Sequence, residues 1–281
     1  MPWNKGCHIV AEIGANHLQS YQRAAALVYV AHKVGADSVK VQMYEPDGMA
    51  DNNDGQIQDG PWKGQTLHEL YEKAAMPLDW VVKLKNIADG LGLGFIASVY
   101  YPEMVEFAEQ IGIRTYKIAS YELLFDKLIE TVANTGKPVI ISTGGGALDE
   151  VEHALQLVRN KHDKVALLKC TSSYPASLES MNLHTILDMR KRFRCPIGLS
   201  DHSLGCVAPV AACVLGARVI EKHITLDSEQ GVDAGFSITP DRFDTMVRTI
   251  RATQISLGST TYGGPSQYRR KQVNGRWLRS V

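Results

Sequence analysis

Short apolar runs bounded by turn residues recur along almost the whole chain, and each is followed by a segment with helical spacing of apolar positions. Eight strand candidates lie at residues 8–13, 38–42, 94–98, 115–119, 138–142, 165–169, 196–200 and 218–223. The clearest helical stretches are residues 21–34, 78–91, 148–159 and 242–257. Repeated strand–helix units with nearly continuous apolar strands predict parallel strands covered by helices.

Eight such units predict an α/β fold whose sheet closes into a (β/α)8 TIM barrel, with an open doubly wound sheet as the alternative. We expect this barrel domain to span residues 1–258. Residues 44–76 are far longer than the usual connection of about two to six residues, and we expect them to cover an active site. Residues 259–281 carry five basic residues and no acidic one, which indicates a solvated end or a functional arm.

Composition narrows the class of protein. Among the 281 residues, 30 are basic and 30 acidic, which argues against a dedicated nucleic-acid binder because phosphate contacts demand a basic excess. No run approaches the roughly 20 apolar residues of a membrane span, and the N-terminus lacks an apolar signal region, so we expect a cytoplasmic protein without a membrane anchor. The 5 cysteines contain no Cys-x-x-Cys pair, which predicts buried, reduced thiols.

Polar residues stand at the carboxyl end of every predicted strand. Enzymes with barrel folds build their sites at this end, so these positions predict an active site. The residues are Glu12, Lys40, Gln42, Ser98, Lys117, Ser120, Glu122, Ser142, Thr143, Lys169, Thr171, Ser200, His202, Glu221 and His223. Three lysines and several carboxylates around one opening favour an anionic ligand, because an unpaired buried charge is costly.

His202 and His223 end consecutive strands, where side chains of a parallel barrel converge at about 5 Å. Two imidazoles with water or substrate oxygens suit a divalent transition metal, and two hydrogen-bonded histidines are the alternative. Gly144, Gly145 and Gly146 stand before a predicted helix, where free backbone N–H groups favour an anion. A plain tight turn explains the glycines equally well.

The strand-end strings resemble those of the sialic acid synthase family, enzymes that condense phosphoenolpyruvate with a sugar to make nine-carbon sugar acids. The strings are AEIGANH from residue 11, VKVQ from 39, YKIASYE from 116, ISTG from 141, KCTSSYP from 169, GLSDHS from 198, EKHIT from 221 and DAGFS from 233. The likeness spans roughly residues 9–258 and keeps the order of the strings.

The resemblance implies a role for each matching position. His202 and His223 would hold Mn²⁺ or Mg²⁺, Glu122 would activate a water molecule, and Glu12 would be a second essential carboxylate near the sugar. Lys117 would be catalytic as well as one of the phosphoenolpyruvate ligands, which are Lys40, Ser98, Lys117, Ser120, Ser142, Ser172 and Ser200. The positions at the aldose are Tyr174, Asp201, Asp233 and Ser237, and Gln42 is a further substrate-binding position. The implied substrates are phosphoenolpyruvate and a small aldose similar to N-acetylmannosamine.

The chain also departs from the family pattern. Its first motif ends in Leu18-Gln19 where the family has x-Gly, and Ser98 and Ser172 replace a threonine and an asparagine. Family members continue into a small antifreeze-like domain that gives an arginine to the partner's sugar site, and we expect no such domain here. A separate antifreeze-like protein, a substrate that does not need the arginine, or a tail arginine would each account for this. The resemblance also implies a homodimer.

Two other functions stay open at this point. One is a Schiff-base aldolase that uses Lys117 or Lys169, since a desolvated lysine on a barrel strand can act as nucleophile. The other is a barrel without catalytic activity that serves as a ligand-binding subunit. The polar ring disfavours this last function, because a barrel without chemistry has no need for costly buried charges.

Overall fold

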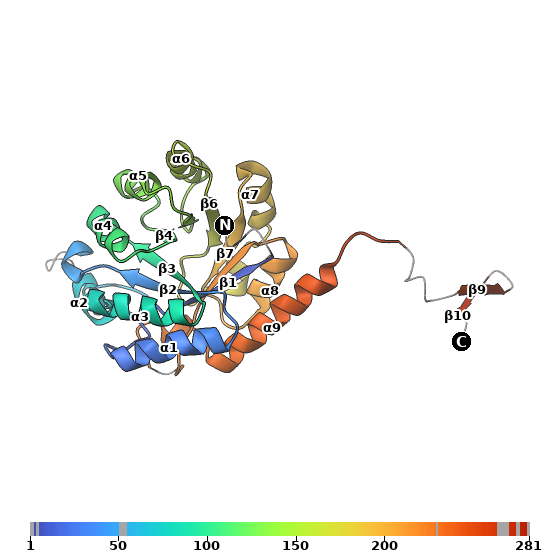
Figure 1. Ribbon diagram of the computed structural model, residues 1–281, viewed down its shortest axis with the longest axis horizontal. Helices are drawn as coiled ribbons and strands as arrows, with labels where there is room; N and C mark the ends of the chain where they lie inside the picture. Colours follow the sequence, from blue (N-terminus) through green and yellow to red (C-terminus); the bar gives the residue numbers. More distant parts are fainter. Residues whose placement is uncertain are drawn as a thin grey trace.

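The computed structural model describes residues 3, 6–50, 55–228, 230–262, 270–273 and 276–279. Eight parallel strands follow one another around a closed barrel in chain order, and the helices lie outside it (Figure 1). The barrel is closed by β1 and β8, whose pairing runs from His8 with Val219 to Glu12 with His223. The predicted (β/α)8 barrel is therefore confirmed, and the open doubly wound sheet is wrong.

The barrel strands agree with the predicted ones to within one residue at either end. They are β1 His8–Glu12, β2 Ser38–Met43, β3 Gly94–Val99, β4 Tyr116–Ile118, β5 Val139–Ser142, β6 Val165–Cys170, β7 Ile197–Asp201 and β8 Val219–His223. The α-helices are α1 Tyr21–Lys33, α2 Leu67–Ala74, α3 Leu78–Gly90, α4 Pro102–Gln110, α5 Asp126–Asn134, α6 Leu148–Arg159, α7 Thr185–Phe193, α8 Val207–Val214 and α9 Pro240–Leu257. In the tail, β9 Arg270–Val273 and β10 Arg276–Arg279 pair as an antiparallel hairpin.

Alternation along the strands divides the barrel residues between two environments. One set of alternate residues packs outward against the helices in the main core, as Ile9 and Ala11 of β1 do. The other set fills the inside of the barrel near its amino end with a separate apolar cluster. This cluster consists of Trp3, Val10, Ile96, Ile140, Ala166, Leu168 and Val219. Further along each strand the same inward positions turn polar, so the apolar cluster forms a floor beneath the polar residues.

Residues 44–76, the part of the connection between β2 and β3 that precedes α3, contain a helix where the sequence predicts a loop. Helix α2 begins after Thr66, whose side chain accepts from the N–H of Glu69 while the Glu69 carboxylate accepts from the Thr66 N–H. This reciprocal capping satisfies two N–H groups that a helix start otherwise leaves unpaired. The Thr-x-x-Glu spacing was the local signal for the helix, and it was missed because its apolar stripe is only eight residues long.

Asp201 and Lys222 form an ion pair between the barrel and its helices. The Lys222 Nζ lies 2.6 Å from Asp201 Oδ2, and both side chains have no exposed surface. Asp201 Oδ1 also accepts from the N–H and the hydroxyl of Ser203. Since neighbouring strand residues point to opposite faces, Asp201 points away from the inward-facing Ser200. Its carboxylate is thus engaged in joining β7 to β8 rather than placed inside the barrel.

We expect Lys222→Met to lower the free energy of unfolding by about 3–5 kcal/mol, because it leaves the Asp201 carboxylate buried without its cation. Urea denaturation measures the change. Lys83→Met is the matched control, since Lys83 forms an exposed ion pair with Asp79 on helix α3. Such an exposed pair contributes little to stability, because water screens both charges. Equal losses in the two variants would contradict a structural role for the Asp201–Lys222 pair.

Candidate active site

Four charged side chains meet inside the barrel above the apolar floor, and we call them the charged layer: Glu12, Lys40, Lys117 and Glu221. The Lys40 Nζ lies 2.9 Å from Glu12 Oε2 and 3.7 Å from Glu221 Oε1. The Lys117 Nζ lies 4.0 Å from the same Glu221 oxygen. The Gln42 amide donates to Glu12 Oε1 at 2.9 Å. The contacts thus join anion to cation in turn, from Glu12 to Lys40, then to Glu221 and finally to Lys117.

The two lysines differ in how well they are neutralised. Burial acts to lower the pKa of Lys40, but the carboxylates of Glu12 and Glu221 outweigh it and raise that pKa. Burial dominates at Lys117 and lowers its pKa, because it has one carboxylate at longer range and the positive Lys40 nearby. Burial acts to raise the pKa of the Glu221 carboxyl, but the two lysines outweigh it and hold that pKa well below the usual range. Lys117 is therefore the cation that gains most from an added anion.

Hydroxyl groups from three neighbouring strand ends gather beside Lys117. Its Nζ donates to Ser142 Oγ at 2.7 Å, and the N–H of Gly144 donates to Ser120 Oγ at 3.0 Å. Gly144 is required for this approach, because a Cβ there would stand 2.2 Å from Ser172 Oγ and 2.9 Å from Ser120 Oγ. One cation, three hydroxyls and a glycine backbone in one place suit the oxygens of a phosphate or carboxylate.

The inward positions also include Ser98 and Ser200, which the sequence analysis assigned to the same ligand. The Ser200 hydroxyl donates to Glu221 Oε1 at 3.2 Å and so joins the charged layer. The Ser98 hydroxyl is buried and makes no hydrogen bond of ordinary geometry among the described residues, although it lies near enough to the Tyr100 phenol to oppose the rise that burial causes in the pKa of Tyr100. Ser98 therefore has only a weak partner within the protein, and a ligand oxygen would satisfy its hydroxyl better.

His202 and His223 face each other with ring centroids 5.6 Å apart. His202 Nδ1 lies 3.1 Å from the Thr171 carbonyl, and His223 Nδ1 lies 3.4 Å from Asp233 Oδ2. An acceptor at Nδ1 favours the tautomer that leaves the Nε2 lone pair free, as in histidines that bind metals. The two imidazoles therefore fit a divalent ion, although no cluster of three His, Cys, Asp or Glu ligands occurs in the described part of the chain.

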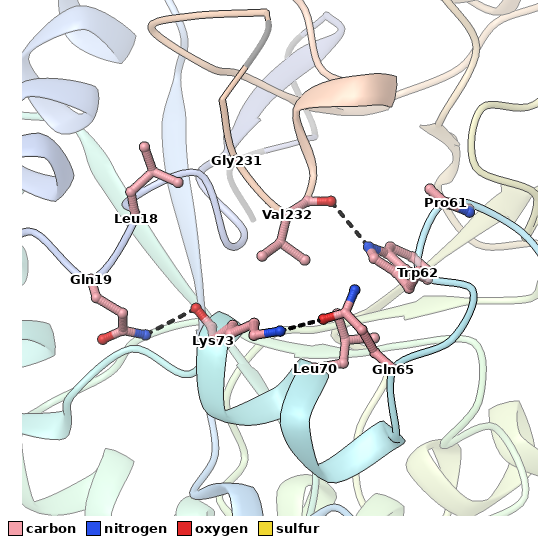
Figure 2. A pocket seen from close by; sticks show the side chains of 9 residues that line it. All are labelled: Leu18, Gln19, Pro61, Trp62, Gln65, Leu70, Lys73, Gly231 and Val232. Atoms are coloured by element: carbon pink, nitrogen blue, oxygen red, sulfur yellow. Dashed lines mark hydrogen bonds between the residues drawn. The ribbon is translucent and has the colours of Figure 1, made fainter. Parts of the chain in front are cut away.

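Aromatic rings surround the histidine pair. Tyr174 lies 4.5 Å from His202 and 4.9 Å from Phe236, measured between ring centroids. Trp62 of the β2–β3 connection packs on Tyr174 at 5.6 Å, and its indole N–H donates to the Val232 carbonyl at 3.1 Å (Figure 2). The β2–β3 connection therefore reaches the mouth of the barrel, as expected of a cover.

Asp233 and Ser237 hold the chain after β8 against the chain after β1. Asp233 Oδ2 accepts from the N–H of Ala15 at 2.8 Å, while Asn16 Nδ2 donates to Ser237 Oγ at the same distance. Gly14 makes this contact feasible, because a Cβ there would lie 2.1 Å from Asp233 Oδ2. Both residues thus lie beside His223, where the sequence analysis expects the sugar site.

Glu122 stands apart from the charged layer. Burial raises the pKa of its carboxyl from the ordinary 4.5 to about 7, while Lys117 and Lys40 oppose the shift. The Glu122 charge in turn raises the pKa of Tyr71 and Tyr100, after the larger effect of their burial. A carboxyl whose pKa lies near neutral suits a general base.

The structure brings together most of the predicted site residues but not all of the polar strand ends. The side chain of Lys169 does not reach the charged layer. Its Nζ donates to the Cys170 carbonyl and to Thr171 Oγ1, and its side chain borders a cavity beside α6 and α7. The expectation of three lysines around one opening is therefore wrong, and two remain. Asp201 likewise has its carboxylate engaged outside the barrel.

Several residues of the site had no role predicted from the sequence. Glu221 was noted only as a polar strand end, yet it is the carboxylate shared by both lysines. Cys170 Sγ lies 3.9 Å from His202 Nδ1, and this histidine helps to lower the thiol pKa to about 7 against the larger, opposite effect of burial. Residues two apart on a strand face the same side. Cys170 follows the inward-facing Leu168 on β6, and Glu221 follows the inward-facing Val219 on β8, so the alternation along each strand could have identified both.

Comparison with known proteins agrees with this geometry. The NeuB family profile matches residues 27–262. The pseudaminic acid synthase of Campylobacter jejuni is 38% identical over 260 residues, which cover 91% of this chain and 76% of the relative. The N,N'-diacetyllegionaminic acid synthase of Legionella pneumophila is 34% identical, covering 90% and 74%. The N-acetylneuraminic acid synthetase structure from Leptospira borgpetersenii superposes with a TM-score of 0.86 at 28% identity, covering 94% of this chain and 89% of the other.

The fold, the polar mouth and these matches define an enzyme of the sialic acid synthase type on a TIM barrel. The chain belongs to the NeuB family. Among the described residues, no helix has the length and apolar character needed to cross a membrane.

The raised pKa of Glu122 predicts a pH effect on stability. The folded protein keeps the Glu122 proton up to about pH 7 and the unfolded chain loses it near 4.5, so this residue makes the free energy of unfolding fall as pH rises between these values. Glu122→Gln removes that contribution. We expect the variant to gain stability relative to the original protein on going from pH 5 to pH 8 in urea denaturation. The exposed Glu130→Gln is the control, and identical pH dependence in all three proteins would refute the shift.

Proposed function

We propose that this chain joins phosphoenolpyruvate to an aldose of the N-acetylmannosamine type, giving a 3-deoxy-2-keto sugar acid and inorganic phosphate. The observation that carries the proposal is the under-neutralised Lys117 with its hydroxyl neighbours, close to the paired histidines. An anion site next to a pair of free imidazole nitrogens suits one anionic and one carbonyl substrate. The names of the most similar proteins support an amino sugar acid as product.

In this proposal the anionic substrate lies against Lys117 and Lys40. The hydroxyls of Ser98, Ser120, Ser142, Ser172 and Ser200 donate to its phosphate and carboxylate oxygens. Because this cradle is largely buried, with Lys40, Lys117, Ser98, Ser142 and Ser200 out of contact with bulk water, it would hold the enol C3 in a fixed direction. Serine side chains are short, so they leave a narrow site, in agreement with the short distances between the Gly144 backbone and the hydroxyls of Ser172 and Ser120.

The aldose lies towards His202 and His223, between Tyr174 and the segment that carries Asp233 and Ser237. The free Nε2 atoms of the two histidines would hold Mn²⁺ or Mg²⁺. Such an ion polarises an aldehyde oxygen as a Lewis acid when it is bound. Gln42 and Glu12 would contact sugar hydroxyls from β2 and β1, the strands that follow β8 around the barrel.

The bonds balance without an external oxidant or reductant. The C3 of phosphoenolpyruvate forms a bond to the aldehyde carbon, and the aldehyde oxygen gains a proton. A water molecule adds at C2, and Glu122 takes its proton, which its pKa of about 7 permits near neutral pH. The C2–O bond to phosphate then breaks while the proton of the new C2 hydroxyl goes to the departing phosphate, which leaves a 2-keto acid as the other product. The proton taken up by Glu122 balances the one that the aldehyde oxygen gained.

One observation favours a second candidate, a Schiff-base aldolase. The lowered pKa of Lys117 is the property that makes a buried lysine nucleophilic. Its Nζ is held by Ser142 and by the Ile118 carbonyl, which suits a fixed cation better than a nucleophile. Borohydride reduction with pyruvate followed by intact mass measurement separates the two, since only the aldolase retains a covalent adduct.

The direct test is phosphate release from phosphoenolpyruvate with a panel of aldoses. The panel contains N-acetylmannosamine, its 6-phosphate and diacetamido trideoxy hexoses, each with Mn²⁺ and then with chelator. We expect metal-dependent turnover with one of these sugars. Failure of every sugar, in spite of phosphoenolpyruvate and Mn²⁺ binding, would contradict the proposed substrate class.

We expect Gly144→Ala to weaken phosphoenolpyruvate binding on the order of 10–100-fold, because the new methyl group displaces the hydroxyls of Ser172 and Ser120. Calorimetric titration with phosphoenolpyruvate measures the loss. Gly90→Ala is the control, since a Cβ at the end of helix α3 meets no atom within 4 Å. Unchanged affinity in Gly144→Ala would remove this corner from the anion site.

We expect His223→Ala to abolish Mn²⁺ binding while the barrel stays folded. Titration of the purified protein with Mn²⁺, followed by electron paramagnetic resonance of the free ion, measures the affinity. His153→Ala is the control, because His153 is exposed on α6 and pairs with Asp126. Equal Mn²⁺ affinity in the two variants would place the ion elsewhere.

A further inference from the structure

The turn after β1 has an unusual backbone. Leu18 and Gln19 adopt consecutive left-handed conformations, with φ of +51° and +52°. This region is disfavoured for residues with a Cβ, and glycine occupies it readily. A glutamine kept in this conformation suggests that its side chain performs a task that glycine could not.

The Gln19 side chain binds the end of helix α2. Its amide nitrogen lies 2.7 Å from the Ala75 carbonyl oxygen and 3.0 Å from that of Lys73, as Figure 2 shows for Lys73. The last carbonyls of a helix have no partner within it, so a donor from elsewhere in the chain fixes the helix end in space. The cap comes from a residue 56 positions away from Ala75 in the sequence.

His17 strengthens the same contact. The backbone N–H of Gln19 donates to His17 Nδ1 at 3.2 Å, which leaves the proton on Nε2. That Nε2 lies 3.1 Å from the Ala74 carbonyl and donates to it. The side chains of His17 and Gln19 thus donate to three successive carbonyls at the end of α2, those of residues 73, 74 and 75.

Helix α2 carries Tyr71 into the neighbourhood of Glu122, near enough for the two side chains to interact electrostatically. Its Tyr71 packs on Tyr44 with ring centroids 5.5 Å apart, and Tyr44 packs in turn on Tyr100 at 5.2 Å. The charge of Glu122 is felt by both Tyr71 and Tyr100. At the other end of the β2–β3 connection, the Trp62 contact with Val232 provides a second attachment (Figure 2).

We propose that Gln19 is a positioning residue, which fastens helix α2 over Glu122 and thereby keeps water away from that carboxyl. The inference rests on the proposed function only for its kinetic consequence. The groups that face Glu122 are Lys117 from β4, Lys40 from β2, Tyr71 from α2 and Tyr100 after β3. Only Tyr71 belongs to the part that Gln19 holds. Releasing α2 therefore hydrates Glu122 without moving the two lysines.

The test compares Gln19→Gly with Leu18→Gly. Both replace one left-handed residue by glycine and relieve the same backbone strain, but only Gln19→Gly removes the cap. Hydrogen exchange followed by mass spectrometry reports on the amides of Leu67–Ala74 without any substrate. We expect faster exchange of this helix in Gln19→Gly, on the order of tenfold, and none of this increase in Leu18→Gly. Equal exchange in both variants would overturn the proposal.

The kinetic arm uses the pH dependence of turnover with the aldose found in the panel. Burial holds the pKa of Glu122 at about 7, so hydration moves the acid limb of kcat to lower pH in Gln19→Gly and leaves it in place in Leu18→Gly. If helix α2 exchanges faster in Gln19→Gly but the acid limb of kcat does not move, the positioning role is overturned. Absence of turnover in the original protein would instead refute the proposed function, and hydrogen exchange would still decide whether Gln19 fastens α2.

Discussion

The charged layer inside the barrel is the constraint on which the rest of the structure depends. Lys40 and Lys117 cannot stay ionised in a dry interior without anions at short range, and Glu12 and Glu221 supply them. This requirement explains why polar residues occupy the inward rows of four strands directly above an apolar floor. It also explains the unequal lysines, since Glu221 is shared and Lys117 receives the weaker interaction. The lysine with the weaker partner is the one surrounded by hydroxyl donors.

The loops after the strands convert this layer into a site with two halves. Hydroxyls from the β4, β5 and β6 ends adjoin Lys117, whereas the rings of Tyr174, Trp62 and Phe236 surround the histidine pair. Glycines at 14 and 144 make both halves feasible, because a Cβ at either place would clash with a functional side chain. The geometry of the site therefore depends on how closely the backbone approaches these side chains, and not only on the polar groups themselves.

The departure at Gln19 shows how a single residue can couple distant loops. Glycine tolerates a left-handed turn more readily, but it has no side chain to offer. Here a glutamine keeps the turn and caps helix α2 of the β2–β3 connection. Because that connection also carries Trp62 and Tyr71, its attachment affects both halves of the mouth.

The sequence by itself determined the barrel, because apolar periodicity of eight strands and the polar residue at each strand end depend only on local order and alternation. It also determined the residue types of the site, including His202, His223 and Glu122. Only the tertiary structure decided which side chains point inward. Lys169 and Asp201 end apolar strands as Lys117 and Ser200 do, yet their side chains are engaged elsewhere, since direction depends on strand register. Glu221 as a shared anion and Gln19 as a helix cap required contacts between residues far apart in the chain, which no local pattern encodes.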